Sequence, residues 1–187
     1  YGSDKPDLRF ELELIDFKEF ALKSSFKTFF EADTIKTVVA KNTDLFTRKK
    51  IDNLTDIAKT YGARGLAWFK VGDNELSGGI SKFFDDELAL EMIETLNLSE
   101  NDILFIVADS HKVACTALGA IRIEIAKHLN LIDVDFFKPV WITDFPMFDY
   151  DDMDQLTPMH HPFTAPKIDN INDLNLDQKN ILSRAYD

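Results

Sequence analysis

The alternation of apolar and polar residues between Phe26 and Leu129 predicts a mixed α/β domain. Short runs rich in aromatic and β-branched residues predict strands at 26–31, 35–41, 66–71 and 103–108. The last run is apolar throughout, so we expect it at the centre of the sheet. A further short strand near 13–16, followed by a short helix, is expected before these elements.

Three longer stretches, 47–61, 85–96 and 110–129, repeat apolar residues at helical spacing. Thr47 suits the N-cap of the first helix and Gly62 suits the position after its end. The resulting order β-β-α-β-α-β-α predicts the α+β class, as a two-layer α/β sandwich. We expect the three helices to cover one face of a single sheet.

The segments on either side of this module have a different character. Residues 1–9 are polar and rich in turn formers, which indicates a solvated connector. Residues 140–148 are largely apolar and predict a buried strand that runs into a proline turn. The acidic stretch 149–154 predicts a loop, and 177–186 predicts a helix.

The stretch Leu156–Thr164 carries two of the four histidines side by side, His160 and His161. The neighbouring prolines restrict the backbone and favour an extended rather than a helical path. Adjacent side chains of an extended segment point to opposite faces. We therefore expect one histidine to face a pocket and the other to face away, which argues against a metal site shared by both.

Composition and charge narrow the function classes. The chain has 187 residues, is 45% hydrophobic and carries a formal net charge of −12, with no long basic run for a nucleic-acid backbone. Cys115 is the single cysteine, which excludes an internal disulfide and favours a cytoplasmic protein. No stretch reaches the roughly 20 apolar residues of a membrane span. We expect a fragment of a longer protein, because the chain has no initiating methionine.

Little in residues 26–130 indicates chemistry. The Ser77-Gly78-Gly79 sequence lacks the Lys-Ser/Thr of a phosphate-binding loop and predicts a turn or bulge. We find no paired acids, no nucleophile beside a base and no ligand cluster in this module, which favours a structural or interaction domain.

Several strings then point to one family. They are Tyr1-Gly-Ser-Asp-Lys-Pro-Asp-Leu-Arg9, Trp141-Ile-Thr-Asp-Phe-Pro-Met-Phe148, Met159-His-His-Pro-Phe-Thr164 and Ala185-Tyr-Asp187. Together, and in this order, they resemble bacterial-type aspartyl-tRNA synthetases. Two further strings, Leu45–Asp52 and Tyr61–Ala67, resemble the GAD domain that is inserted into the class II catalytic domain of these enzymes.

The resemblance implies a division of the chain and a reaction. Residues 1–19 would leave the catalytic domain, 20–134 would form the GAD insertion, and 135–187 would return to the catalytic domain, which is built on an antiparallel sheet. Such enzymes use ATP and Mg²⁺ to activate aspartate and then transfer it to tRNA. They are cytoplasmic homodimers and do not associate with a membrane.

The resemblance also assigns site residues, although it implies no catalytic side chain in this stretch. His160 matches a histidine that contacts the bound aspartate, and an imidazolium is suited to donate charge-assisted hydrogen bonds to a carboxylate. His161 matches its neighbour and would support it. Asp187 matches an acid that helps to hold the Mg²⁺ on ATP through oxygen ligands. Ala165 departs from the hydroxyl residue of many members.

A second interpretation stays open. The GAD domain also occurs in subunits of tRNA-dependent amidotransferases, where the module is not catalytic. Such a module has no need of the strings at 144–148 and 159–164, so the flanks favour the synthetase. The remaining motifs of the active site lie outside this chain, and we expect it to be inactive alone. The sequence leaves open whether asparagine tRNA is also a substrate, and whether the GAD domain acts as a lever or as architecture.

Overall fold

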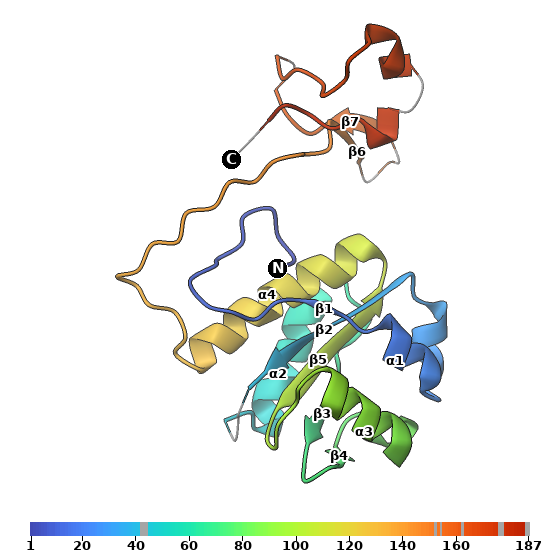
Figure 1. The fold of residues 1–187 in the computed structure, drawn as a ribbon, viewed down its shortest axis with the longest axis vertical. Helices are drawn as coiled ribbons and strands as arrows, with labels where there is room; N and C mark the ends of the chain where they lie inside the picture. Colours follow the sequence, from blue (N-terminus) through green and yellow to red (C-terminus); the bar gives the residue numbers. More distant parts are fainter. Residues whose placement is uncertain (42–44, 152, 154, 162, 176–177, 186–187) are drawn as a thin grey trace. The chain divides into compact units, whose positions relative to one another are not determined.

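A computed structural model describes residues 1–41, 45–151, 153, 155–161, 163–175 and 178–185. The chain divides into two compact units, Tyr1–Lys138 and Pro139–Asp187. Both units are drawn in Figure 1.

The first unit is built on a five-stranded sheet in the order β1-β2-β5-β3-β4. The strands are β1 (Ile15–Asp16), β2 (Thr34–Ala40), β3 (Ala67–Val71), β4 (Leu76–Ser77) and β5 (Ile103–Asp109). Every neighbouring pair is antiparallel, and β2 pairs with β5 from Thr34 opposite Asp109 to Ala40 opposite Ile103. The prediction that the most apolar strand lies at the centre is confirmed, since β5 is the middle strand.

Four helices accompany the sheet: α1 (Lys18–Lys23), α2 (Arg48–Thr60), α3 (Asp86–Thr95) and α4 (His111–His128). The predicted N-cap of α2 is present, and the structure adds an N-cap for α3. The Thr47 side chain accepts a hydrogen bond from the Lys50 amide, and Asp85 accepts one from the Leu88 amide. Gly62 follows α2 with φ of 87°, a left-handed conformation that suits glycine.

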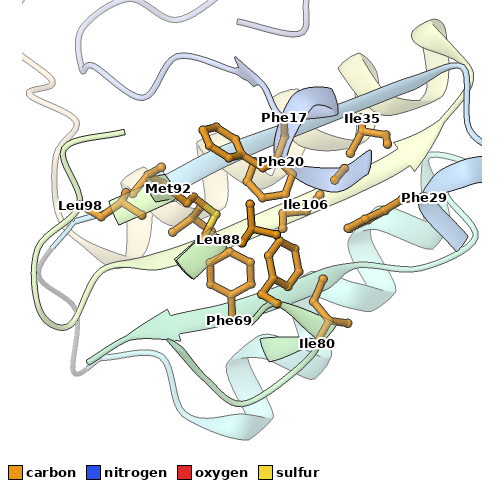
Figure 2. Close-up of a cluster of buried hydrophobic side chains, with 14 of the residues drawn as sticks. Phe17, Phe20, Phe29, Ile35, Phe69, Ile80, Leu88, Met92, Leu98 and Ile106 are labelled. Carbon is orange, nitrogen blue, oxygen red and sulfur yellow. The ribbon is translucent and has the colours of Figure 1, made fainter. Parts of the chain in front are cut away.

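The α+β class with an antiparallel sheet is confirmed, but the placement of all three long helices on one face is wrong. Side chains of α2 and α4 pack on one face with Val38 and Phe105. Side chains of α1 and α3 pack on the other face with Phe69 and Ile106 (Figure 2). The continuous apolar run of β5 explains the difference, because a strand buried on both faces needs apolar residues at every position.

The run 26–31 is not the predicted strand but a 3₁₀ helix, η1 (Lys27–Glu31). Its spacing places Phe26 and Phe29 on the same side, with ring centroids 4.9 Å apart. Phe29 is buried in the core and Phe30 is 56% exposed. An aromatic pair three residues apart serves this packing, whereas a strand would send the two rings to opposite faces.

The glycine pair after β4 forms a turn, in line with the prediction of a turn or bulge. It leads into the short 3₁₀ helix η2 (Ser81–Phe83), and Gly78 and Gly79 both have positive φ. A Cβ on Gly79 would lie 1.7 Å from the Trp68 carbonyl oxygen, and one on Gly78 would lie 2.6 Å from the Trp68 ring. The two glycines therefore allow the chain to cross close over Trp68.

The prediction that residues 1–9 form a solvated connector holds only in part. Ser3, Asp4 and Lys5 are exposed, but Gly2 lies against helix α4 and Phe10 is buried. Figure 1 shows this N-terminal segment, in blue, beside α4. The composition of this segment did not indicate its contact with α4, because the helix contacts backbone atoms of the segment.

The second unit has little regular structure. A hairpin of β6 (Phe148–Tyr150) and β7 (Leu156–Pro158) and two 3₁₀ turns, η3 (Ile171–Asn175) and η4 (Gln178–Asn180), are its elements among the described residues. The predicted strand at 140–148 is wrong except at its end, and Trp141 is 74% exposed. The predicted helix at 177–186 is also wrong, because η4 gives way to extended residues that bridge at Leu182 and Ser183.

Candidate functional site

The histidine stretch is held by the hairpin of the second unit. Phe148 pairs with Pro158 at the end of β7, and the Met159 amide donates a hydrogen bond of 3.0 Å to the Met147 carbonyl. The chain then bends at Met159 and His160. The extended path predicted from the prolines therefore holds through Pro158 and ends at His160.

An extended strip, residues 181–184, supports the site from within the unit, with alternate residues buried. The Ser183 amide donates to the Phe145 carbonyl over 2.7 Å, and the Arg184 amide donates to the Ala165 carbonyl over 2.8 Å. Ile181 is 6% exposed and Ser183 is 1% exposed. Backbone hydrogen bonds on both sides of the strip fix the segment that carries Phe145 relative to the one that follows the histidines.

His160 is partly buried and turns toward Phe145. The two ring centroids are 5.0 Å apart with the planes at 80°, an edge-to-face contact. The buried Nε2 atom of His160 has no hydrogen-bond partner among the described residues. An unpaired buried polar atom costs about 1–3 kcal/mol, so its presence requires an explanation.

His161 has different surroundings. It is exposed, its Nδ1 accepts a hydrogen bond of 3.3 Å from the Phe163 amide, and its ring lies 4.5 Å from the Phe163 ring. The structure thus gives the two adjacent histidines different surroundings, although the chain bends here and does not follow the extended path on which the expected alternation rested. The described residues contain no group of three or more His, Cys, Asp or Glu side chains that could hold a metal ion.

A charged pair lies one residue from Phe145. Lys167 Nζ donates a hydrogen bond to Asp144, and this bond and the lysine charge hold the pKa of Asp144 below its ordinary value. Asp144 has φ of 61°, the left-handed region. The pair fixes the turn before Phe145 to the segment after the histidines, so it supports the site without touching the His160 ring.

The third predicted site residue, Asp187, lies outside the described residues. The geometry of the site therefore rests on the histidine stretch and its neighbours alone. The arrangement that the structure does show is one imidazole nitrogen, held in place by an aromatic ring and a network of backbone hydrogen bonds. Such a nitrogen can donate a hydrogen bond to an anionic oxygen or accept one from a donor.

The first unit offers a contrast. A cavity of about 220 Å³ lies against its sheet, with a largely apolar wall that includes Phe29, Leu66 and Ile106 and with Arg64 also lining it. Among the described residues, no cysteine, histidine, aspartate or glutamate lines this cavity. We assign it no chemistry. In the part of the chain that the structure describes, no helix is long and apolar enough to cross a membrane.

One residue of the first unit escaped the sequence analysis. Arg122 interrupts the apolar stripe of α4, yet it is 1% exposed. A charged residue at a stripe position is the signal that could have identified it, because such residues are rarely buried without partners.

Comparison with known proteins finds one domain family and several full-length relatives. Residues 27–118 match the GAD domain. The chain is 44% identical to aspartate–tRNA ligase 2 of Streptococcus mutans and 46% identical to aspartate–tRNA ligase of Streptococcus agalactiae. It is 42% identical to aspartate–tRNA(Asp/Asn) ligase of Desulfotalea psychrophila. Each match covers 100% of the chain.

The chain spans about a third of the length of these curated relatives, 32% in each case. The matched GAD residues lie inside the predicted limits 20–134, and the similarity extends through the flanks on both sides. The resemblance stated from the sequence strings is confirmed. The chain contains a GAD domain and, over its whole length, is similar to bacterial aspartate–tRNA ligases.

Proposed function

We propose that the chain is part of an aspartate–tRNA ligase that activates aspartate with ATP and passes it to tRNA. The observation that carries the proposal is that the similarity to aspartate–tRNA ligases runs through the GAD domain and both flanks. A GAD module of an amidotransferase would share the central residues alone, so this interpretation is not favoured. Residues 1–19 and 135–187 are proposed as segments of the catalytic domain.

Within this function, His160 binds the substrate aspartate. Its Nε2 is buried and has no partner among the described residues, and a carboxylate of the substrate would supply one. A protonated imidazole donates a short, charge-assisted hydrogen bond to such an oxygen. The Phe145 ring and the backbone network hold the imidazole in place before the substrate arrives, which reduces the cost of ordering it on binding.

His161 has a supporting role in this proposal. Its Nδ1 is occupied by the Phe163 amide, so it stabilises the turn after His160. ATP is the second substrate, and Mg²⁺ bound to it would be held in part by Asp187. Dimerisation of the full-length enzyme is proposed as well. The chain alone is expected to be inactive, because one contact cannot replace a complete site.

The test is aspartate-dependent exchange of pyrophosphate into ATP by the full-length enzyme, with His160→Ala and with His161→Ala as a matched control. We expect His160→Ala to raise the KM for aspartate at least about tenfold, since a charge-assisted hydrogen bond contributes roughly 1.5–3 kcal/mol. His161→Ala is expected to change it by a factor of about three or less, because an exposed neutral hydrogen bond contributes less.

Two outcomes would contradict the proposal at different levels. Absence of aspartate-dependent exchange by the unaltered full-length enzyme would remove the ligase function. Normal exchange by both the enzyme and His160→Ala would keep the function and remove His160 from the aspartate site.

A further inference from the structure

Arg122 is a buried cation on the GAD helix α4. It lies among the buried apolar residues of that helix, between Leu118 and Ile125, and is 1% exposed. Burial lowers its pKa, while the charge of Asp7 raises it. A buried charge without partners is strongly disfavoured, so the contacts of this guanidinium indicate its role.

The guanidinium bonds to the backbone of the leading segment, which comprises residues 1–14. Arg122 Nε donates to the Leu12 carbonyl over 2.9 Å, and Nη2 donates to the Asp7 carbonyl over 2.9 Å and to the Phe10 carbonyl over 3.4 Å. One side chain of the helix therefore gathers three carbonyl groups spread over six residues of the segment. This is the pattern of a clamp on a chain that has no regular structure of its own.

Two aromatic rings of the same segment cover the cation. The guanidinium carbon lies 4.3 Å from the centroid of Phe10 and 4.9 Å from that of Tyr1. Both contacts are within the range of cation–π attraction. The leading segment thus bends back on itself, because residues at both of its ends meet the same side chain.

The segment also lies directly on the helix. A Cβ on Gly119 would be 2.8 Å from the Gly2 carbonyl oxygen, and a Cβ on Gly2 would be 2.2 Å from the Cys115 carbonyl oxygen. Further along, Arg9 pairs with Asp7 and donates from Nη1 to the Asp133 carbonyl over 3.4 Å. The leading segment consequently contacts both α4 and the chain that leaves it.

We propose that Arg122 is a positioning residue, which fixes the leading segment on α4 and so sets how the GAD domain is carried by the chain before it. The inference rests on the proposed ligase function. The residues assigned to aspartate and ATP all lie outside the first unit, so loosening the clamp leaves aspartate activation intact. Transfer to tRNA, a substrate far larger than one domain, then depends on the held orientation.

Trypsin cleavage after Arg9 reports the clamp on the chain itself. Phe10, which follows that bond, is buried and bonded to Arg122, so cleavage requires local opening. We expect Arg122→Met to speed release of residues 1–9 by about tenfold or more, the factor that corresponds to about 1.4 kcal/mol. Arg48→Met, which removes an exposed arginine of α2, is the control and leaves the rate unchanged.

A second variant keeps the test decisive if Arg122→Met does not fold. Gly119→Ala adds a methyl group against the Gly2 carbonyl while it favours the helical state of α4. We expect the first unit to stay folded and the cleavage to become faster. Unchanged cleavage in every folded variant would overturn the inference.

The full-length enzyme supplies the readout that a merely structural role would not move. We expect Arg122→Met to keep aspartate-dependent pyrophosphate exchange within about twofold and to lower kcat/KM for tRNA charging about fivefold or more, as a coupling effect. Arg122→Lys keeps the charge and is expected to restore part of the charging. Equal loss of exchange and charging, or unchanged charging with a released segment, would overturn the inference. If the unaltered enzyme shows no exchange with aspartate, the proposed function fails and the inference fails with it.

Discussion

The apolar side chains of the two units are buried to different degrees. In the central strand β5, residues 103–107 are at most 2% exposed, whereas Trp141, Met153 and Phe163 of the second unit are 74%, 79% and 91% exposed. The first unit has comparable exposure at Val134 and Phe137, which follow α4 next to the boundary. The first unit thus closes its own core, and the second has apolar surface that fits contact with further protein.

Buried polar side chains also differ between the two units in their hydrogen-bond partners. In the first unit the buried Arg122 has three carbonyl acceptors, and the buried Thr37 hydroxyl donates to the Phe105 carbonyl over 3.0 Å. In the second unit the buried His160 Nε2 has no partner among the described residues. Among the described residues, the GAD domain therefore pairs its buried polar side-chain atoms internally, whereas the second unit leaves one such atom unpaired.

Separating the units should give the largest effect. We expect residues 1–138 to fold alone and to unfold cooperatively, with a free energy of unfolding of about 5–15 kcal/mol. Residues 139–187 alone are expected to show no cooperative transition, because so short a chain with one hairpin lacks a sufficient core. Thermal unfolding followed by circular dichroism measures both. A sharp transition in 139–187 would show that the second unit also has a core of its own.

Two phenylalanine substitutions in the intact chain compare the contribution of each unit to stability. Phe105 is 0% exposed and its ring lies 5.5 Å from that of Phe46, so Phe105→Ala should lower the free energy of unfolding by about 3–5 kcal/mol. Phe163→Ala, at the exposed end of the histidine stretch, should change it by less than about 0.5 kcal/mol. Urea titration gives both values. Similar losses would mean that the second unit also has a core.

The smallest expected effect is a loss of stability of the first unit at acidic pH. The hydrogen bonds from Arg9 hold the pKa of Asp7 below its ordinary value, so the unfolded chain takes up a proton before the folded chain does. The stability from this pair is present above pH about 4, the unfolded value, and is lost as the pH falls through the folded value. The loss should stay within about 1 kcal/mol, because the pair is partly exposed.

Asp7→Asn should remove this part of the acid dependence of the first unit, measured as the urea midpoint at pH 5 and pH 3. Asp144→Asn is the matched control, since Asp144 is likewise paired with a cation but lies in the second unit. It should leave the curve of the first unit unchanged. If Asp144→Asn also removed the acid dependence, the effect would not come from the Asp7–Arg9 pair of the first unit.

The sequence predicted the first unit well where local signals agree with burial. The cap Thr47 and the apolar run of β5 identify their elements directly. The division of the helices between two faces was missed because an apolar stripe shows that a helix is buried but not against which face. The continuous apolar strand contained that information.

The second unit was harder to predict for a physical reason. Residues 140–148 are apolar enough for a buried strand, but apolar composition does not distinguish a core from a surface that another part of a protein covers. The different surroundings of His160 and His161 were expected, but the extended path from which they were inferred gives way to a bend at Met159 and His160. Their proposed roles came from family resemblance, and they stay proposals.

The clamp at Arg122 has a consequence for which substitutions the leading segment tolerates. A guanidinium that bonds to carbonyl oxygens recognises the course of the main chain, so these hydrogen bonds do not depend on the side chains at Asp7 and Leu12. Those side chains are constrained by other contacts, because Asp7 pairs with Arg9 and Leu12 packs against the buried core. The attachment itself restricts the two glycines in close contact, Gly2 and Gly119, and the two rings, Tyr1 and Phe10. A search for distant relatives that keep this attachment would weigh these four positions and the arginine together.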